Sequence, residues 1–252
     1  MNYRTPALLA ITLLSVTALE AGPPTFDVAS VKISKAEDSA ILMGNGMIDA
    51  ASGRIRVPSV GGTVNMTNWS LSMCVWAAWD LSPEQLSRPS WMNFDRYDIV
   101  AKTSPQASQA DLRLMLQSLL AERFKLATHR ETKELSSYAL VAAKNGPKLK
   151  ASTGDLLLPV VFAPPARFIG QGSTMQALAG VLGRPAGRPV VDQTGIAGTF
   201  DFSLTYTTDD PADTGPSIFT ALQEQLGLKL EPQKSQIEFL VVDHAERVPT
   251  EN

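Results

Sequence analysis

The second half of this sequence repeats landmarks of the first half in the same order. Five landmarks recur after intervals of 100 to 104 residues. They are the helix starts Ser70-Leu71 and Thr174-Met175, the pairs Arg88-Pro89 and Arg188-Pro189, the strands 97–101 and 200–204, the helix ends 120–124 and 222–226, and the strands 138–141 and 238–241. A nearly constant interval is typical of internal duplication, and each copy then forms the same supersecondary unit. We therefore predict two tandem, diverged repeats of one small unit.

Each predicted repeat mixes helices with strands. Residues 200–206 alternate apolar and polar side chains, which is typical of a strand with one buried face. We expect local hairpins that pair 125–130 with 138–143 and 229–232 with 237–242, and a central strand at 237–242 that is covered on both sides. The predicted fold class is α+β, in which each repeat packs two helices on a small mixed or antiparallel sheet.

Several helix boundaries are visible in the sequence. Ser70, Thr174 and Ser108 precede apolar helical stretches, and their hydroxyls can accept a hydrogen bond from a free N–H group in the first turn. An acidic residue three positions after Ser108 completes a capping-box-like pair. Gly227 is placed to end the last helix. The segment 180–189, GVLGRPAGRP, predicts a helix exit followed by a turn.

The domain organisation follows from these elements. We predict a signal peptide at 1–21, an N-terminal strand and loop region at 22–62, the first repeat at 63–150, a linker and strand at 151–172, and the second repeat at 173–252. Within the N-terminal region, alternation predicts one strand at 26–33 and a short strand at 54–57.

The N-terminus has the composition of an export signal. Arg4 supplies a positive charge, and Ala7–Ala18 is an apolar stretch of 12 residues, too short to span a bilayer. Ala18 and Ala21 are candidate cleavage positions. No later stretch is apolar for about 18 residues, so we expect no transmembrane segment in the mature chain. The predicted location is the periplasm or the medium.

Charge and cysteine content exclude several classes of function. The formal net charge is −3, from 22 basic and 25 acidic residues, and no basic stripe indicates a nucleic-acid partner. The single cysteine, Cys74, excludes an intramolecular disulfide and a multi-cysteine metal cage. It lies in an apolar stretch, where a free cysteine is usually buried and unreactive. We expect no cofactor and no metal.

The residues that could support catalysis are few. His129 and His244 are the only histidines, they lie in different predicted repeats, and their spacing matches no zinc motif. A hydrolytic site could still form between the repeats, if one histidine met acids such as Asp98, Asp192 or Asp243. Two surface histidines at strand ends are the alternative interpretation.

The tryptophans are the most unusual concentration in the sequence. Trp69, Trp76, Trp79 and Trp91 fall within 23 residues, and Trp69 and Trp76 are seven apart on one expected helical face. They predict either an aromatic binding surface or the core of the first repeat. Two arginines of the turn at 180–189, which are Arg184 and Arg188, could hold a carboxylate or phosphate, although a solvated loop also fits.

Longer motifs resemble a known family. They are FDVASVK at 26–32, RPSWMNFDRYDIVAK at 88–102, LLAERFKLATHRETKELSSYALV at 119–141, GRPVVDQTGIAGTFDFSLTY at 187–206 and SIFTALQEQLGLKLEP at 217–232. Together these motifs are similar to the DUF3738 family of exported soil-bacterial proteins. The resemblance covers nearly the whole mature chain. It implies export but assigns no biochemical function, and some relatives are joined to sensor-type membrane metallopeptidases. This chain departs from the family at Ile33, where proline is usual.

Two hypotheses of different classes remain. The repeat also resembles, at the level of fold, the short N-terminal domains of secretins and TonB-dependent transducers, which are non-catalytic docking modules. The first hypothesis is an exported, non-catalytic binding or docking protein that acts on an envelope protein partner or a small ligand by strand addition or groove docking. The alternative is an exported hydrolase-like enzyme with a site between the two repeats. The oligomeric state is not indicated by the sequence.

Overall fold

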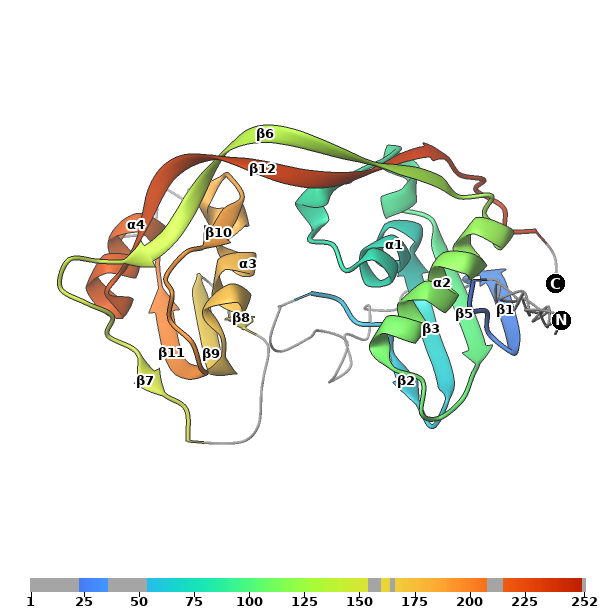
Figure 1. The fold of residues 1–252 in the computed structure, drawn as a ribbon, viewed down its shortest axis with the longest axis horizontal. Coiled ribbons are helices and arrows are strands. Elements are labelled where there is room, and N and C mark those ends of the chain that lie inside the picture. Colours follow the sequence, from blue (N-terminus) through green and yellow to red (C-terminus); the bar gives the residue numbers. More distant parts are fainter. Residues whose placement is uncertain (1–22, 36–53, 154–159, 164–165, 208–214, 251–252) are drawn as a thin grey trace, which may run out of the picture.

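A computed structural model shows an α+β protein with two lobes and a long β-ribbon that joins them (Figure 1). The structure describes residues 23–35, 54–153, 160–163, 166–207 and 215–250. Within these residues, four α-helices accompany three four-stranded sheets. The predicted fold class is confirmed at this level. The predicted signal peptide and most of the loop after residue 35 lie outside the described residues.

The first lobe is an antiparallel sheet covered on one face by two helices. Its strands are β1 (Val28–Ile33), β2 (Ser59–Val60), β3 (Thr63–Ser70) and β5 (Arg96–Lys102), in the order β1-β5-β3-β2. Its helices are α1 (Leu71–Trp79) and α2 (Gln109–Arg123), with short 3-10 turns η1 (Pro83–Gln85) and η2 (Ser90–Asn93) between them. Alternate strand residues such as Val64, Met66 and Ile99 are fully buried against helix residues such as Leu116. The sheet therefore has one apolar face and one exposed face.

The second lobe has the same sheet order. Its strands are β7 (Lys150–Ala151), β8 (Val161–Ala163), β9 (Arg167–Ser173) and β11 (Phe200–Thr205), in the order β7-β11-β9-β8. Its helices are α3 (Met175–Ala186) and α4 (Ile218–Ala221), and α4 continues as a π-helical turn η3 (Leu222–Leu226). A second, separate core packs around Leu178, Leu204 and Leu222.

The ribbon contains the strands that we expected to form local hairpins. Strand β6 (Ala127–Ala142) pairs antiparallel with β12 (Leu228–His244) along nearly its whole length. Two short strands, β4 (Leu86–Ser87) and β10 (Val190–Asp192), flank the ribbon in the order β10-β6-β12-β4. The hairpin prediction is wrong because no turn interrupts residues 131–137, so β6 continues from one lobe to the other. The ribbon thus brings each lobe a strand from the other half of the chain.

Burial along the ribbon follows from this crossing. Leu140 of β6 is fully buried in the core of the second lobe, and Leu240 of β12 belongs to the core of the first lobe. The other residues of 237–242 are only half-buried or exposed. The prediction of a strand covered on both sides is therefore wrong, because the ribbon is central in its sheet but packs on a lobe only near its ends (Figure 1).

The helix starts are confirmed in detail. The hydroxyl oxygens of Ser70 and Thr174 accept hydrogen bonds from Met73 N at 3.2 Å and Ala177 N at 3.1 Å. Ser108 forms a full capping box with its acidic partner. These contacts lie within one helical turn, so they depend only on nearby residues.

Two other local predictions need correction. Helix α3 does not end near Gly180 but continues through Pro185 to Ala186, and Gly187 caps it at φ 71°. A proline in the last turn removes only one backbone hydrogen bond, which the packing of α3 tolerates. Residues 54–57 form an isolated bridge at Ile55 and not a strand. None of the helices in the described ranges is long and apolar enough to cross a membrane.

Candidate functional site

The four tryptophans pack against the core of the first lobe. Trp69 is 2% exposed at the end of β3, so it lies on a strand and does not share a helical face with Trp76. Trp76 and Trp79 on α1 and Trp91 in η2 are partly buried against the same core. The loss of a shared helical face follows from Ser70, which caps α1 and leaves Trp69 in the preceding strand.

Arginines of the chain itself cover two of these rings. The Arg88 guanidinium lies 5.1 Å from the centre of a Trp76 ring and donates to Ser72 Oγ at 2.7 Å. Burial lowers the pKa of Arg88. The Arg247 guanidinium lies 5.6 Å from a Trp91 ring and is held by Asp95 through bonds of 2.8 and 3.0 Å. These cation–π contacts occupy ring faces that an aromatic ligand site would need to keep open.

The two predicted anion-binding arginines lie in the other lobe. Arg184 is in the last turn of α3, and Arg188 follows the cap of that helix; both are exposed. The Arg188 guanidinium lies 5.4 Å from the Tyr138 ring. The structure therefore does not bring these arginines together with the tryptophans into one site.

The histidines lie on the exposed ribbon. His129 Nδ1 is 2.8 Å from Asp243 Oδ1 and 3.0 Å from Oδ2, with both side chains about half exposed. His244 Nε2 is 4.0 Å from Glu246. The ribbon register explains the first pair, because Val241 lies opposite His129 and places Asp243 two residues further along.

The other two candidate acids accept hydrogen bonds from backbone N–H groups. Asp98 Oδ1 accepts a hydrogen bond from Asn68 N at 2.8 Å, and Asp192 Oδ1 accepts from Thr194 N at 2.9 Å. Both bonds hold local bends of the chain. Of the three acids considered for a hydrolytic site, only Asp243 contacts a histidine. No group of three or more His, Cys, Asp or Glu side chains that could hold a metal occurs in the described ranges.

Cys74 is fully buried in α1, as predicted. Burial raises the pKa of its thiol to about 12, so the nucleophilic thiolate form is scarce at neutral pH.

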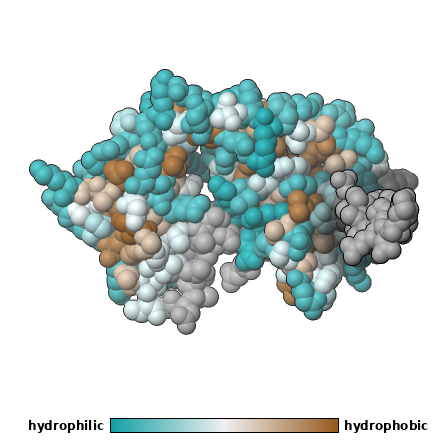
Figure 2. Space-filling view, viewed as in Figure 1, coloured by the Kyte–Doolittle hydropathy of each residue, from teal (hydrophilic) through white to brown (hydrophobic). Residues whose placement is uncertain are grey.

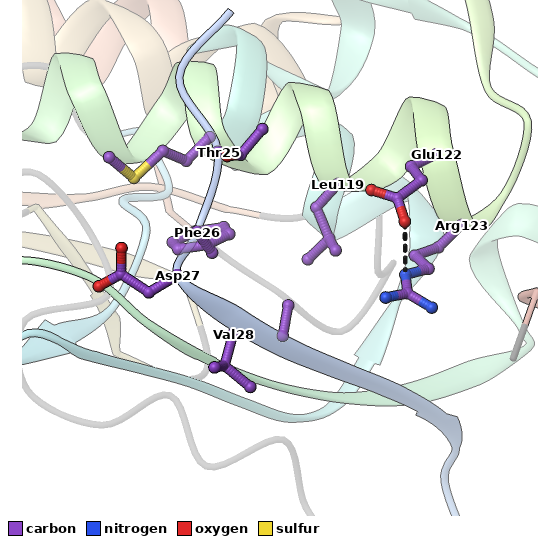
Figure 3. A pocket seen from close by; sticks show the side chains of 9 residues that line it. Thr25, Phe26, Asp27, Val28, Leu119, Glu122 and Arg123 are labelled. Carbon is purple, nitrogen blue, oxygen red and sulfur yellow. Dashed lines mark ion pairs between the residues drawn. The ribbon is translucent and has the colours of Figure 1, made fainter. Parts of the chain in front are cut away.

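A cavity that the sequence did not indicate lies between β1 and α2. It encloses about 280 Å³, and Figure 3 shows its lining side chains. The residues are Thr25, Phe26, Asp27, Val28 and Ala29 from the N-terminal segment and Met115, Leu119, Glu122 and Arg123 from α2. Polar and apolar groups both line the wall, and polar atoms make the larger share of its exposed surface; the ion pair of Glu122 with Arg123, 3.4 Å long, lies at its rim. The only sequence signal was the apolar face of α2, which does not show where that face leaves a gap.

The cavity adjoins an open sheet edge. Strand β1 is the outermost strand of its sheet. Ser34 N donates to Arg96 O at 2.8 Å, so the even-numbered residues of β1 form the bonds to β5. Backbone groups alternate along an antiparallel strand, so the N–H and C=O groups of Ala29, Val31 and Ile33 point outward. Within the described ranges no strand or side chain bonds to them.

The comparisons with known proteins identify a family. No curated protein and no solved structure matches the chain. A family model, described as protein of unknown function DUF3738, matches residues 72–245. The match includes the second lobe, the whole ribbon and the first lobe from α1 onward, but not β1, β2 or β3, and it confirms the resemblance to this family. The chain belongs to the DUF3738 family.

Proposed function

We propose that this chain is an exported, non-catalytic docking protein that acts in the cell envelope. An extended segment of a partner adds to the outer edge of β1 and places one side chain in the adjoining cavity. The observation that carries this proposal is the open edge of β1 beside a cavity of about 280 Å³ whose wall is partly polar and partly apolar. Main-chain hydrogen bonds to a sheet edge supply affinity in such complexes, and pockets for alternate side chains supply specificity.

The chemistry of the cavity indicates what kind of side chain it accepts. Phe26 packs against the core of the first lobe, and Leu119 is buried in that core. Ala29 is small and leaves room beside the strand. An aliphatic side chain suits the apolar part of this wall, because burial of such a side chain contributes about 1.5–3 kcal/mol. The charged pair of Glu122 and Arg123 at the rim suits a polar neighbour on the partner segment.

The proposal includes a duplication that produced the two lobes. Two similarities support it beyond the shared sheet order. Asp98 accepts a bond from Asn68 N at φ 59°, and Asp201 accepts one from Gly172 N at φ 63°, each just before a helix. Each of the helical segments before β6 and β12 is also followed by a residue in the left-handed backbone conformation. These residues are Lys125 and Gly227. Small duplicated α+β modules of secretins and transducers dock partners, and this analogy of fold agrees with a docking role.

The hydrolase alternative rests on one observation, the contact of His129 with Asp243. A carboxylate can orient an imidazole for general-base catalysis. The pair is about half exposed, whereas catalytic pairs depend on a site that excludes water. If the alternative holds, His129→Ala abolishes hydrolysis of peptide or ester substrates by the purified protein; docking requires no such activity.

The decisive experiment uses capture from envelope extract. Ala29→Pro removes one outward N–H group and leaves the bonds to β5, so we expect it to abolish capture of the partner that the unmodified protein retains. Ala29→Ser keeps the N–H group and the small size, and serves as the matched control. Equal capture by the Ala29→Pro and unmodified proteins, with unchanged thermal stability, would contradict docking at β1. Mass spectrometry of the exported protein tests the predicted cleavage near Ala21.

A further inference from the structure

We infer that the segment that docks on β1 is β1 of a second copy of this chain. This inference rests on the proposed docking function and names the partner at the same edge. Two copies of the first lobe would form one continuous eight-stranded sheet around a two-fold axis. Such an isologous contact requires a surface that is complementary to itself, and β1 meets this requirement in backbone pattern, shape and charge.

The backbone pattern restricts the register. Only Ala29, Val31 and Ile33 offer outward hydrogen-bonding groups. A two-fold axis at Val31 pairs this residue with its own copy and pairs Ala29 with Ile33 of the second copy, on both sides of the axis. The next register, with Val31 opposite Ile33, would place Lys32 opposite its own copy, and directly opposed like charges destabilise a strand pair. The register centred on Val31 places Lys32 opposite Ser30.

The same register fills the cavity. Side chains that are directly opposite in paired strands lie on the same face of the sheet. Ile33 of the second copy therefore lies beside Ala29, which is one of the residues that line the cavity, as is Leu119. Ile33 is 55% exposed in the single chain. Pairing would bury this exposed aliphatic side chain against the apolar part of the cavity wall, twice per dimer.

Charge agrees with this arrangement. The register centred on Val31 brings Asp27 of one copy to Lys35 of the other at both ends of the pair. Both residues are exposed, and neither forms an ion pair with another described residue. The long lysine side chain reaches the carboxylate from either direction along the strand. The chain thus carries opposite charges at the two ends of its open edge, as antiparallel self-pairing requires.

Sedimentation velocity of the purified protein tests this inference between about 1 and 200 µM. We expect a concentration-dependent dimer. Ile33→Lys is expected to weaken it at least about 30-fold, because it removes the side chain that enters the cavity and adds a like charge. Val60→Lys is the matched control, because Val60 is 86% exposed on the opposite edge strand and lies outside the inferred contact. A monomer throughout this range would overturn the inference.

Charge exchange tests the register itself. Asp27→Lys and Lys35→Asp are each expected to weaken the dimer about tenfold, and the double variant to restore it, since it reverses both pairs. If the dissociation constant of the dimer is unchanged in all three variants, the dimer uses another surface and the register is refuted. The outcome also separates the two proposals. If the protein stays monomeric while Ala29→Pro still abolishes capture from envelope extract, the dimer is wrong and docking at β1 stands.

Discussion

The two lobes share a sheet order but differ at one equivalent edge. In the first lobe, β5 pairs along its outer side with the six residues of β1, and Lys102 O accepts a hydrogen bond from Asp27 N at 2.9 Å. In the second lobe, β11 pairs on that side with only the two residues of β7. There the side chain of Gln225 donates to Thr205 O at 2.7 Å and accepts from Thr205 N at 2.9 Å.

This difference shows how one arrangement of strands supports two kinds of edge. The amide of Gln225 satisfies one backbone position as a neighbouring strand would, and so reduces the capacity of β11 to pair with another chain. The first lobe instead extends its sheet by a full strand and leaves the outer side of that strand open beside a cavity. The proposed docking therefore concerns the first lobe, and the following predictions test this contrast between the lobes.

The largest loss of stability is expected from replacing the two leucines of the ribbon that are buried in the cores of the lobes. Leu140→Ala and Leu240→Ala should each destabilise the protein by about 3 kcal/mol, since both side chains are buried in cores. Hydrogen exchange should then accelerate in the second lobe for Leu140→Ala and in the first for Leu240→Ala. Leu135→Ala, at the half-buried middle of the ribbon, is the control with a smaller effect. Equal acceleration in both lobes would show that they do not unfold separately.

The helix ends before β6 and β12 should respond in opposite directions. Gly227→Ala places a Cβ atom 2.1 Å from Gly146 O at φ 64°, so we expect a loss of about 2–3 kcal/mol. Lys125→Gly relieves a lysine at φ 48°, and a gain of about 0.5 kcal/mol is expected. Urea denaturation measures both changes. A destabilised Lys125→Gly variant would mean that contacts of the lysine side chain outweigh the backbone strain.

Removal of the amide that protects β11 should make the second lobe resemble the first. Gln225→Ala leaves both backbone groups of Thr205 to water, which costs about 1 kcal/mol, and it opens the edge to other strands. We expect more self-association by light scattering. Gln225→Glu retains the acceptor and loses the donor, so its behaviour should be intermediate. Unchanged association of both variants would remove the protective role assigned to this amide.

The smallest effect concerns acid stability. The pKa of Asp201 lies below its usual range, first because Gly172 N donates to its carboxylate and also because Ser152 does so. A lowered pKa in the folded state stabilises the protein above about pH 4, and this contribution disappears as pH falls through the folded-state value. Asp201→Asn should therefore flatten the dependence of melting temperature on pH below about pH 4. An unchanged profile would show that this bond adds nothing to acid stability.

Local features were accessible from the sequence. Ser70, Ser108, Thr174 and Gly227 have the predicted caps, because each cap depends on contacts within a few residues. The alternation over 200–206 correctly predicted which side chains of β11 face the core. Strand partners were not accessible in this way. Alternation shows that a segment is extended, yet it does not show which distant segment supplies the hydrogen bonds.

The sequence by itself determined the α+β composition, the helix starts and the buried face of β11, because these depend on neighbours along the chain. Only the tertiary structure decided that β6 pairs with β12, that Asp243 meets His129 and that a cavity lies beside the open edge of β1. Each of these features joins residues far apart in the chain. The free energy that selects them comes from burying both lobes at once, and no local window of sequence contains both partners.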